Sequence, residues 1–208
     1  MSLTLGEIRD QITTALTHLA GMASAQQQQA DVLNGPGRIL IKPTDCILGT
    51  GAPMALFVDG DDGTPGLYVG EDTIGVRWND HATPEAIAFR AIVDETFDNT
   101  AVATLKVYCS KVGATADNTA TLDITAINQE LAALHNADSD YGDTTAEIGD
   151  PEATSRTIQV IELELAAENL PAGPAGIAFT ITPTAGTLDD DDLIIHFIVL
   201  EFTRKAAS

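Results

Sequence analysis

Strict alternation of apolar and polar residues constrains this chain more than any other feature of its sequence. Successive side chains of a β-strand point to opposite faces of a sheet, so alternation predicts strands with one face in a core and the other in water. Turn-rich segments separate the alternating ones, which favours an all-β, antiparallel β-sandwich. Immunoglobulin-like and jelly-roll topologies both fit this periodicity. The residues predicted to face the core are Ile87, Phe89, Ala91 and Val93; Ala101, Ala103, Leu105, Val107 and Cys109; Leu122, Ile124 and Ala126; and Ile177, Phe179 and Ile181.

Two other apolar segments depart from simple alternation. In "RTIQVIELEL" the apolar positions are even at Ile158 and Val160 and odd from Ile161 onward. A shift of one residue turns every later side chain to the other face, so we expect either a β-bulge or a strand that switches sheets near Val160. The segment "LIIHFIVLEF" is apolar at nearly every position, which is typical of a central strand covered on both faces.

The first 30 residues carry helix signals instead. Thr4 and Glu7 have the spacing of a capping box, and apolar residues then recur at intervals of three and four, as at the a and d positions of a coiled coil. These residues are Leu5, Ile8, Ile12, Ala15, Leu19 and Met22. A helix packed on its own domain and a self-associating helix, as in a trimer, both fit the pattern. If the helix self-associates, these six residues form the oligomerisation surface.

The same signals divide the chain into three predicted parts. Residues 1–35 form an N-terminal α-helical arm, which the Gly and Pro residues around position 36 terminate. Residues 36–66 form a β-rich connecting segment, and residues 67–208 form the β-sandwich. The segment "MALFVDGDDGTPGLYVG" predicts a strand, a turn and a second strand. The long polar stretch at 129–155 predicts a functional or partner-facing loop.

Charge restricts the partners that the chain can bind. The sequence has 31 acidic and 10 basic residues, a formal net charge of −21. All but four of the acidic and three of the basic residues lie within 59–208, so that part carries a net charge of −20. Nucleic-acid binders need basic patches, so we expect no nucleic-acid partner. We also expect no membrane partner, because no stretch approaches the roughly 20 apolar residues of a membrane span.

No residue pattern predicts catalysis, a cofactor or a metal centre. Cys46 and Cys109 form no spaced motif, as in a protein made in a reducing cytosol. The four histidines are far apart, and His196, within an apolar strand, fits a hydrogen-bonded core residue better than a metal ligand. Glu162 and Glu164 could act as acid and base but fall on the exposed face of a strand. The chain is therefore predicted not to be an enzyme.

Two acidic runs have a second interpretation. The run Asp189–Asp192 fits a solvated turn that leads into a strand beginning at Leu193, with a cation site as the alternative. The run at 59–63, "DGDDG", resembles the beginning of a calcium loop but lacks a third ligand and the distant Glu.

One long stretch is similar to a known family. "GLYVGEDTIGVRWNDHATPEAIAFRAIVDETFDNTAVATLKVYCSK" resembles tailed-bacteriophage capsid decoration (cement) proteins of the jelly-roll type. "IELELAAENLPAGPAGIAFTITP" and "DDDLIIHFIVLEF" resemble later strands and turns of that family, and the resemblance covers about 67–205. It implies a homotrimer, made in the host cytoplasm, that binds the outer surface of the phage head. There it would stabilise the capsid by bridging neighbouring major capsid protein subunits, without catalytic residues or cofactors.

The alternative function is a carbohydrate-binding module or a head or tail fibre attachment module. That function predicts exposed aromatic side chains on a concave face. Aromatic residues make up only 5% of the chain, with Trp78 as its single tryptophan.

Overall fold

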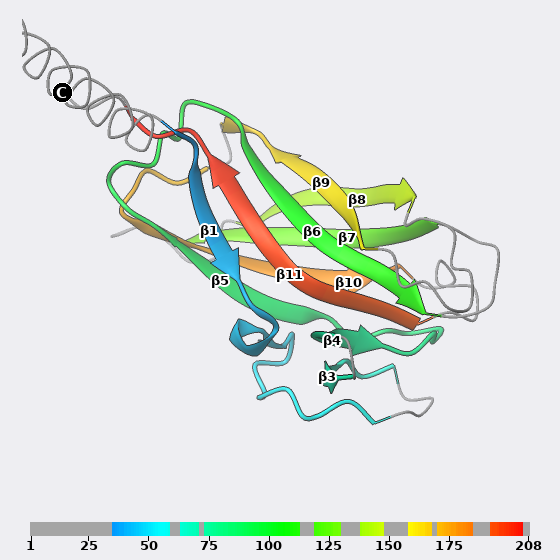
Figure 1. Ribbon diagram of the computed structural model, residues 1–208. Helices are drawn as coiled ribbons and strands as arrows, with labels where there is room; N and C mark the ends of the chain where they lie inside the picture. Colours follow the sequence, from blue (N-terminus) through cyan, green and yellow to red (C-terminus); the bar gives the residue numbers. More distant parts are fainter. Residues whose placement is uncertain are drawn as a thin grey trace, which may run out of the picture. The chain divides into compact units, whose positions relative to one another are not determined.

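Two antiparallel sheets face each other in the part of the chain that this computed structural model describes (Figure 1). The described residues are 35–58, 63–70, 73–112, 119–129, 138–147, 158–167, 170–184 and 192–205. Sheet A has the order β3 (Gly66–Val69), β4 (Ile74–Trp78), β11 (Asp192–Phe202), β6 (Ala103–Val112) and β9 (Gln159–Leu165), and β1 (Gly37–Ile41) also pairs with β11. Sheet B has the order β2 (Ile47–Leu48), β5 (Ile87–Val93), β10 (Ala175–Pro183), β7 (Thr119–Gln129) and β8 (Asp138–Glu147).

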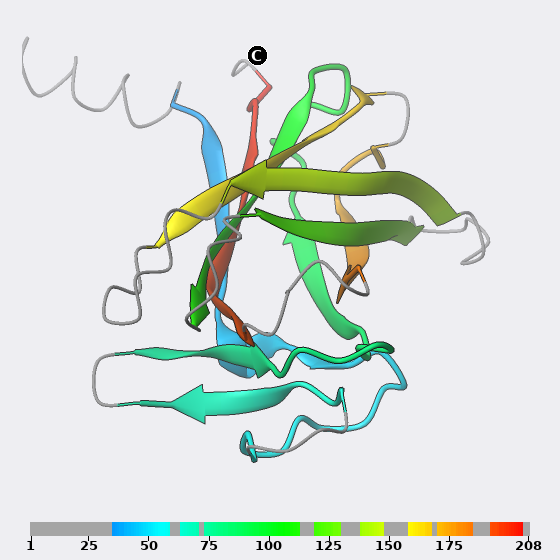
Figure 2. The same ribbon diagram turned by 90° about the vertical axis from the view of Figure 1, so that its right-hand side faces the viewer.

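The prediction of an all-β antiparallel sandwich is confirmed. Figure 2 shows the two sheets from the side, with β3 and β4 at one end of the sandwich. A short 3-10 helix, Pro43–Asp45, joins β1 to β2. These two strands, from the predicted connecting segment, pair with β11 and β5. The predicted helical arm lies outside the described residues, apart from Gly35.

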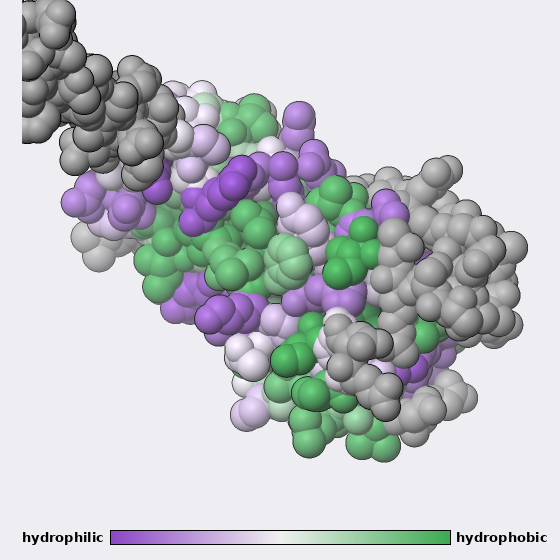
Figure 3. All heavy atoms as spheres, viewed as in Figure 1, coloured by the Kyte–Doolittle hydropathy of each residue, from purple (hydrophilic) through white to green (hydrophobic). Residues whose placement is uncertain are grey.

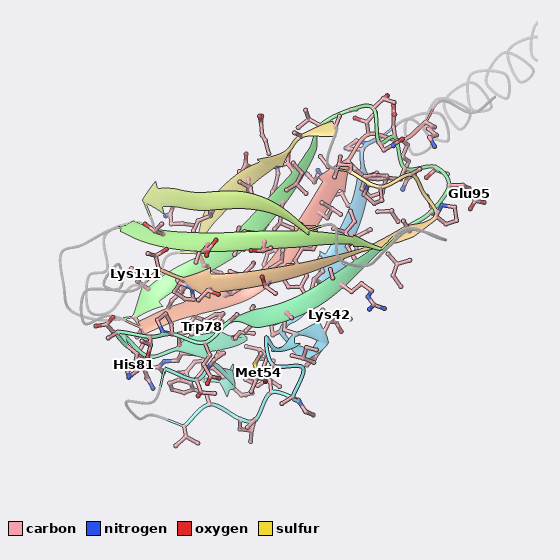
Figure 4. All side chains as sticks on the ribbon, turned by 180° about the vertical axis from the view of Figure 1, so that it is seen from behind. Lys42, Met54, Trp78, His81, Glu95 and Lys111 are labelled. Atoms are coloured by element: carbon pink, nitrogen blue, oxygen red, sulfur yellow. The ribbon has the colours of Figure 1, made fainter. Side chains whose placement is uncertain are left out.

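The core lies between the sheets and is formed by the inward positions of the alternating segments. Apart from Ala101, which precedes β6, every residue predicted to face the core is buried. Phe89 and Phe179 stack across β5 and β10 with ring centroids 5.2 Å apart. Trp78 is also buried between the sheets, and its Nε1 donates a hydrogen bond to the Glu85 carbonyl at 2.8 Å (Figure 4).

The bulge or change of sheet predicted near Val160 is wrong. Strand β9 pairs with β6 in an unbroken register from Gln159 to Leu165, with Val160 outward and Ile161 inward. The irregularity lies in β11, whose register with β6 shifts between Ile195 and Phe197. The sequence pattern misled because Ile158 and Val160 are exposed apolar residues, which alternation cannot distinguish from core residues.

Two further segments differ from the prediction. The stretch at 129–155 contains β8, which pairs with β7, so it is not simply a loop. The first strand predicted before β3 is reduced to an isolated parallel bridge between Leu56 and Leu67. Gly66 allows this close crossing, since a Cβ there would lie 2.4 Å from the Phe57 Cα.

Candidate functional site

An apolar stripe crosses the outer face of sheet A, the face turned away from sheet B. Neighbouring members of the stripe are either cross-strand partners or residues two positions apart on the same strand. In order, they are Leu40 on β1, Val199 and Phe197 on β11, Tyr108 on β6 and Val160 on β9. We call these five residues the outer stripe. Leu40 is 54% exposed and Val160 is 38% exposed, and the other three are partly buried. Figure 3 views this face and shows apolar side chains over β1 and β11 beside hydrophilic ones.

Two aromatic rings occupy the middle of the outer stripe. Tyr108 and Phe197 are cross-strand partners, with ring centroids 4.3 Å apart and an interplanar angle of 21°. Stacked aromatic pairs are favourable beyond the area that they bury. Because the two rings stack, one face of each ring is covered by the other.

The bulge in β11 places these side chains outward. Ile195 pairs with Cys109 and Phe197 pairs with Tyr108, so His196 is the additional residue. Before the bulge, the odd-numbered residues of β11 face the core; after it, the even-numbered ones do, from Ile198 to Phe202. Phe197, Val199 and Glu201 therefore face outward. A bulge that changes the direction of following side chains is a common feature beside binding sites.

His196, the extra residue of the bulge, is hydrogen-bonded to β6 and to the residue that precedes β4. Its Nδ1 lies 2.7 Å from the Thr73 Oγ1, just before β4, and its Nε2 lies 2.8 Å from the Ser110 Oγ on β6. His196 is buried, so the prediction of a hydrogen-bonded interior histidine is confirmed. The side chain joins β4, β11 and β6 where the pairing of β11 passes from β4 to β1.

A charged network borders the outer stripe. The Lys106 Nζ lies 2.7 Å from the Glu201 Oε2 and 3.2 Å from the Glu162 Oε1, and the Arg38 Nε lies 2.7 Å from the Glu201 Oε1. Hydrogen bonding and charge from Lys106, with a smaller effect from Arg38, lower the pKa of Glu201. Glu201 and then Glu162 raise the pKa of Lys106 in return. The network holds donors and acceptors at fixed positions beside the aromatic rings.

Arg77 organises a second aromatic group at the β3 and β4 end of this face. Its guanidinium carbon lies 4.6 Å from the Phe57 ring centroid and 4.8 Å from the Tyr68 ring centroid, within cation–π range. Its Nε also donates to the Asp192 Oδ2 at 2.8 Å. Asp192 is thus paired with Arg77, which corrects the prediction that this carboxylate is solvated. The other aspartates of that run and most of 59–63 lie outside the described residues.

The described residues give no support to a catalytic or metal site. Burial raises the pKa of the Cys46 and Cys109 thiols to about 12, so neither is a thiolate at neutral pH. Ser110 contacts His196 but is 0% exposed, which closes its hydroxyl to substrate. No group of three or more His, Cys, Asp or Glu side chains is placed to hold a metal in these segments.

No helix within the described segments is long and apolar enough to cross a membrane.

The outer stripe is not the site that the sequence singled out. The predicted oligomerisation residues, from Leu5 to Met22, lie outside the described residues, so their role stays a prediction. Tyr108 could have been found, because alternation along β6 turns it outward. Phe197 and Val199 could not, because the segment around them is apolar at nearly every position and the bulge that turns them outward has no separate sequence signal.

No protein-family model and no curated protein sequence matches this chain. Among solved structures, a xylan-binding module, CBM15, aligns over 83% of this chain and all of its own, with 13% identity and a TM-score of 0.50. The CBM22-2 xylan-binding domain of Paenibacillus barcinonensis Xyn10C aligns over 79% of this chain and 99% of its own, with 9% identity and a TM-score of 0.44. A family 29 carbohydrate-binding module from Piromyces equi aligns over 81% and 91%, with 7% identity and a TM-score of 0.42. The alignment with CBM15, at 13% identity, shows a β-sandwich fold alone.

Proposed function

We propose that this protein is a non-catalytic carbohydrate-binding module of the jelly-roll type, with the outer stripe as its binding surface. One observation carries the proposal. Among the described side chains, four aromatic ones are partly exposed, and all four lie on or over the outer face of sheet A. They are Phe57, Tyr68, Tyr108 and Phe197.

The chemistry of this face suits a sugar chain. A pyranose ring has apolar C–H faces and hydroxyl groups around its edge, so it needs both apolar surface and hydrogen-bonding groups. Binding sites for small ligands typically combine a mainly apolar lining with a few fixed polar groups. Here Tyr108 and Phe197 supply the apolar surface. Lys106 supplies a donor and Glu162, whose side chain is 53% exposed, supplies an acceptor.

The xylan-binding module that shares the fold supports this proposal, because it binds a polysaccharide on a sandwich of matching extent. The proposal needs no catalytic group, in agreement with the buried thiols and the inaccessible Ser110. It therefore replaces capsid decoration as the first candidate.

Calorimetric titration of the full chain with xylan-derived and cellulose-derived oligosaccharides tests the proposal. We expect binding that Tyr108→Ala and Phe197→Ala each weaken at least about tenfold, the usual effect of removing a central aromatic contact. Thr180→Ala, on the outer face of sheet B, is the matched control and should leave the affinity unchanged. Circular dichroism melting of each variant separates lost binding from lost folding. Equal affinities in all four proteins would refute the assignment to the outer stripe.

Capsid decoration is a second candidate, which the charge distribution favours. A body of net charge −20 is repelled by packaged DNA and is suited to the outer surface of a virion. In this proposal the chain, made in the host cytoplasm, trimerises through its N-terminal heptads and binds the major capsid protein, and sugar binding would then serve attachment. Electron cryomicroscopy of purified particles should place the protein on the outside of the head. Particles that lack it would rule this candidate out.

A further inference from the structure

We infer that the ligand of the outer stripe is an uncharged, extended glycan at least about 14 Å long, lying across the strands rather than along them. This inference rests on the proposed carbohydrate-binding function and adds the chemical class, length and direction of the ligand. Three observations support it. The positions of the stripe residues give the length and direction of the ligand, the pairing of the nearby charges gives its charge class, and the remaining hydrogen-bonding groups suit its hydroxyls.

The length and direction follow from the strand pairings. The outer stripe begins at Leu40 on β1, continues through β11 and β6, and ends at Val160 on β9. It therefore spans three inter-strand spacings of about 4.8 Å each, or about 14 Å in total. An extended chain that follows the apolar surface must cross these four strands. A single sugar ring would cover only part of it.

The charge class follows from how the nearby charges are paired. On the outward positions of β1, β6, β9 and β11 there are two cationic side chains, Arg38 and Lys106, and both are bound to carboxylates. Three glutamates, Glu162, Glu164 and Glu201, lie on the same rows. An anionic sugar would place a further negative charge beside these three glutamates, in the field of a chain with net charge −21. An uncharged glycan meets no such repulsion.

The polar groups that stay available suit hydroxyls. The Lys106 ammonium has three donors, and Glu162 and Glu201 occupy two of them within the described residues. Glu162 has a second carboxylate oxygen and a largely exposed side chain. A hydroxyl both donates and accepts hydrogen bonds, so one sugar hydroxyl can bridge the two groups without breaking the ion pair. A carboxylate on the ligand can only accept.

A titration series on the full chain tests the inference. The ligands are neutral xylo-oligosaccharides of one to six units and oligogalacturonates of the same lengths, each at low and high salt. We expect the affinity for the neutral series to rise with length and level off once the chain spans about 14 Å. At low salt the oligogalacturonates should bind at least about tenfold more weakly than the neutral oligosaccharides. High salt should reduce this difference in affinity, because it screens the repulsion between the ligand and the acidic protein.

Two variants separate local charge from overall charge. Glu162→Gln with Glu164→Gln should raise oligogalacturonate affinity several-fold, whereas Asp123→Asn, on the outer face of sheet B, should change it little. Equal or tighter binding of oligogalacturonate by the parent protein at low salt, lost in Tyr108→Ala, would overturn the charge class and leave the proposed function intact. A neutral affinity that does not rise with length would overturn the length and direction. Failure of every glycan to bind would overturn the proposed function as well.

Discussion

The two outer faces of this sandwich are built on the same strand alternation yet differ sharply in chemistry. The outer face of sheet A has the Tyr108 and Phe197 stack and a four-member ion-pair network. The described outward positions of sheet B hold mostly small side chains, together with Ile47, Arg90, Ile92 and Asp123. The small residues are Ala88, Thr121, Thr125, Gly176, Ala178, Thr180 and Thr182. Small side chains make a sheet face flat, whereas large amphipathic side chains project from it and present both apolar and hydrogen-bonding groups.

The contrast indicates where the constraint from folding ends. Inward positions of both sheets must fill a shared core, and they are correspondingly apolar and buried. Outward positions do not fill the core, so large aromatic rings there expose apolar area that folding does not require. Contiguous exposed apolar surface bordered by polar residues commonly marks an interaction site. On this reasoning we place the proposed binding surface on sheet A and not on the described part of sheet B.

The two stacked aromatic pairs give the largest expected difference. Phe179 stacks on Phe89 inside the core, whereas Phe197 stacks on Tyr108 at the surface. Phe179→Ala should lower the free energy of unfolding by about 3–5 kcal/mol, because it leaves a cavity in a fully packed interior. Phe197→Ala should cost about 1 kcal/mol, the order of one stacking interaction. Guanidinium denaturation of both variants measures the two values, and similar losses would contradict the assignment of Phe197 to a surface role.

The pH dependence of the charged network is a smaller effect. Lys106, and to a lesser degree Arg38, hold the pKa of Glu201 below its usual range. A carboxyl with a lowered folded-state pKa stabilises the fold above its unfolded pKa of about 4.3 and loses that contribution as the pH falls through its folded pKa. Glu201→Gln should therefore lower the melting temperature at pH 7, and the difference from the parent should shrink as the solution is acidified.

Glu164→Gln is the control for that measurement. It removes the same charge from the same face but from outside the ion-pair network. An acid-dependent loss of equal size in Glu164→Gln would mean that overall charge, and not the pairing with Lys106, sets the pH dependence.

The smallest effect is expected on the outer face of sheet B. Thr180 and Thr125 are cross-strand partners on β10 and β7, both partly buried. Thr180→Val keeps a β-branched side chain of nearly the same shape, so the free energy of unfolding should change by less than about 0.5 kcal/mol. Glycan affinity should stay at the parent value. A clear loss of affinity in calorimetry would move the binding surface to sheet B.

The sequence predicted the inward faces of the strands well, because burial imposes a simple period of two. It failed wherever that period was broken or hidden. The bulge at His196 depends on hydrogen bonds to Thr73 and Ser110, which are distant in sequence. Strand β8, "DSDYGDTTAE", has no apolar alternation and is defined by its backbone pairing with β7.

The candidate site was harder to predict for the same reason. Its five residues come from four strands that are adjacent only after folding. Alternation marks Tyr108 as outward, but it cannot show that Phe197 lies opposite. It also treats Val160 as one half of a bulge. The Lys106 network likewise joins β1, β6, β9 and β11 through a register that no local pattern encodes.

Chemical-shift mapping of the ¹⁵N-labelled full chain with a saturating neutral oligosaccharide tests most directly whether the binding surface lies on sheet A. The largest backbone amide shifts are predicted at Tyr108, Phe197 and Val199, with smaller ones at Leu40 and Val160 and none at Thr125 or Thr180. Shifts that concentrate on Thr125, Thr180 and their neighbours, with the outer stripe unchanged, would contradict it.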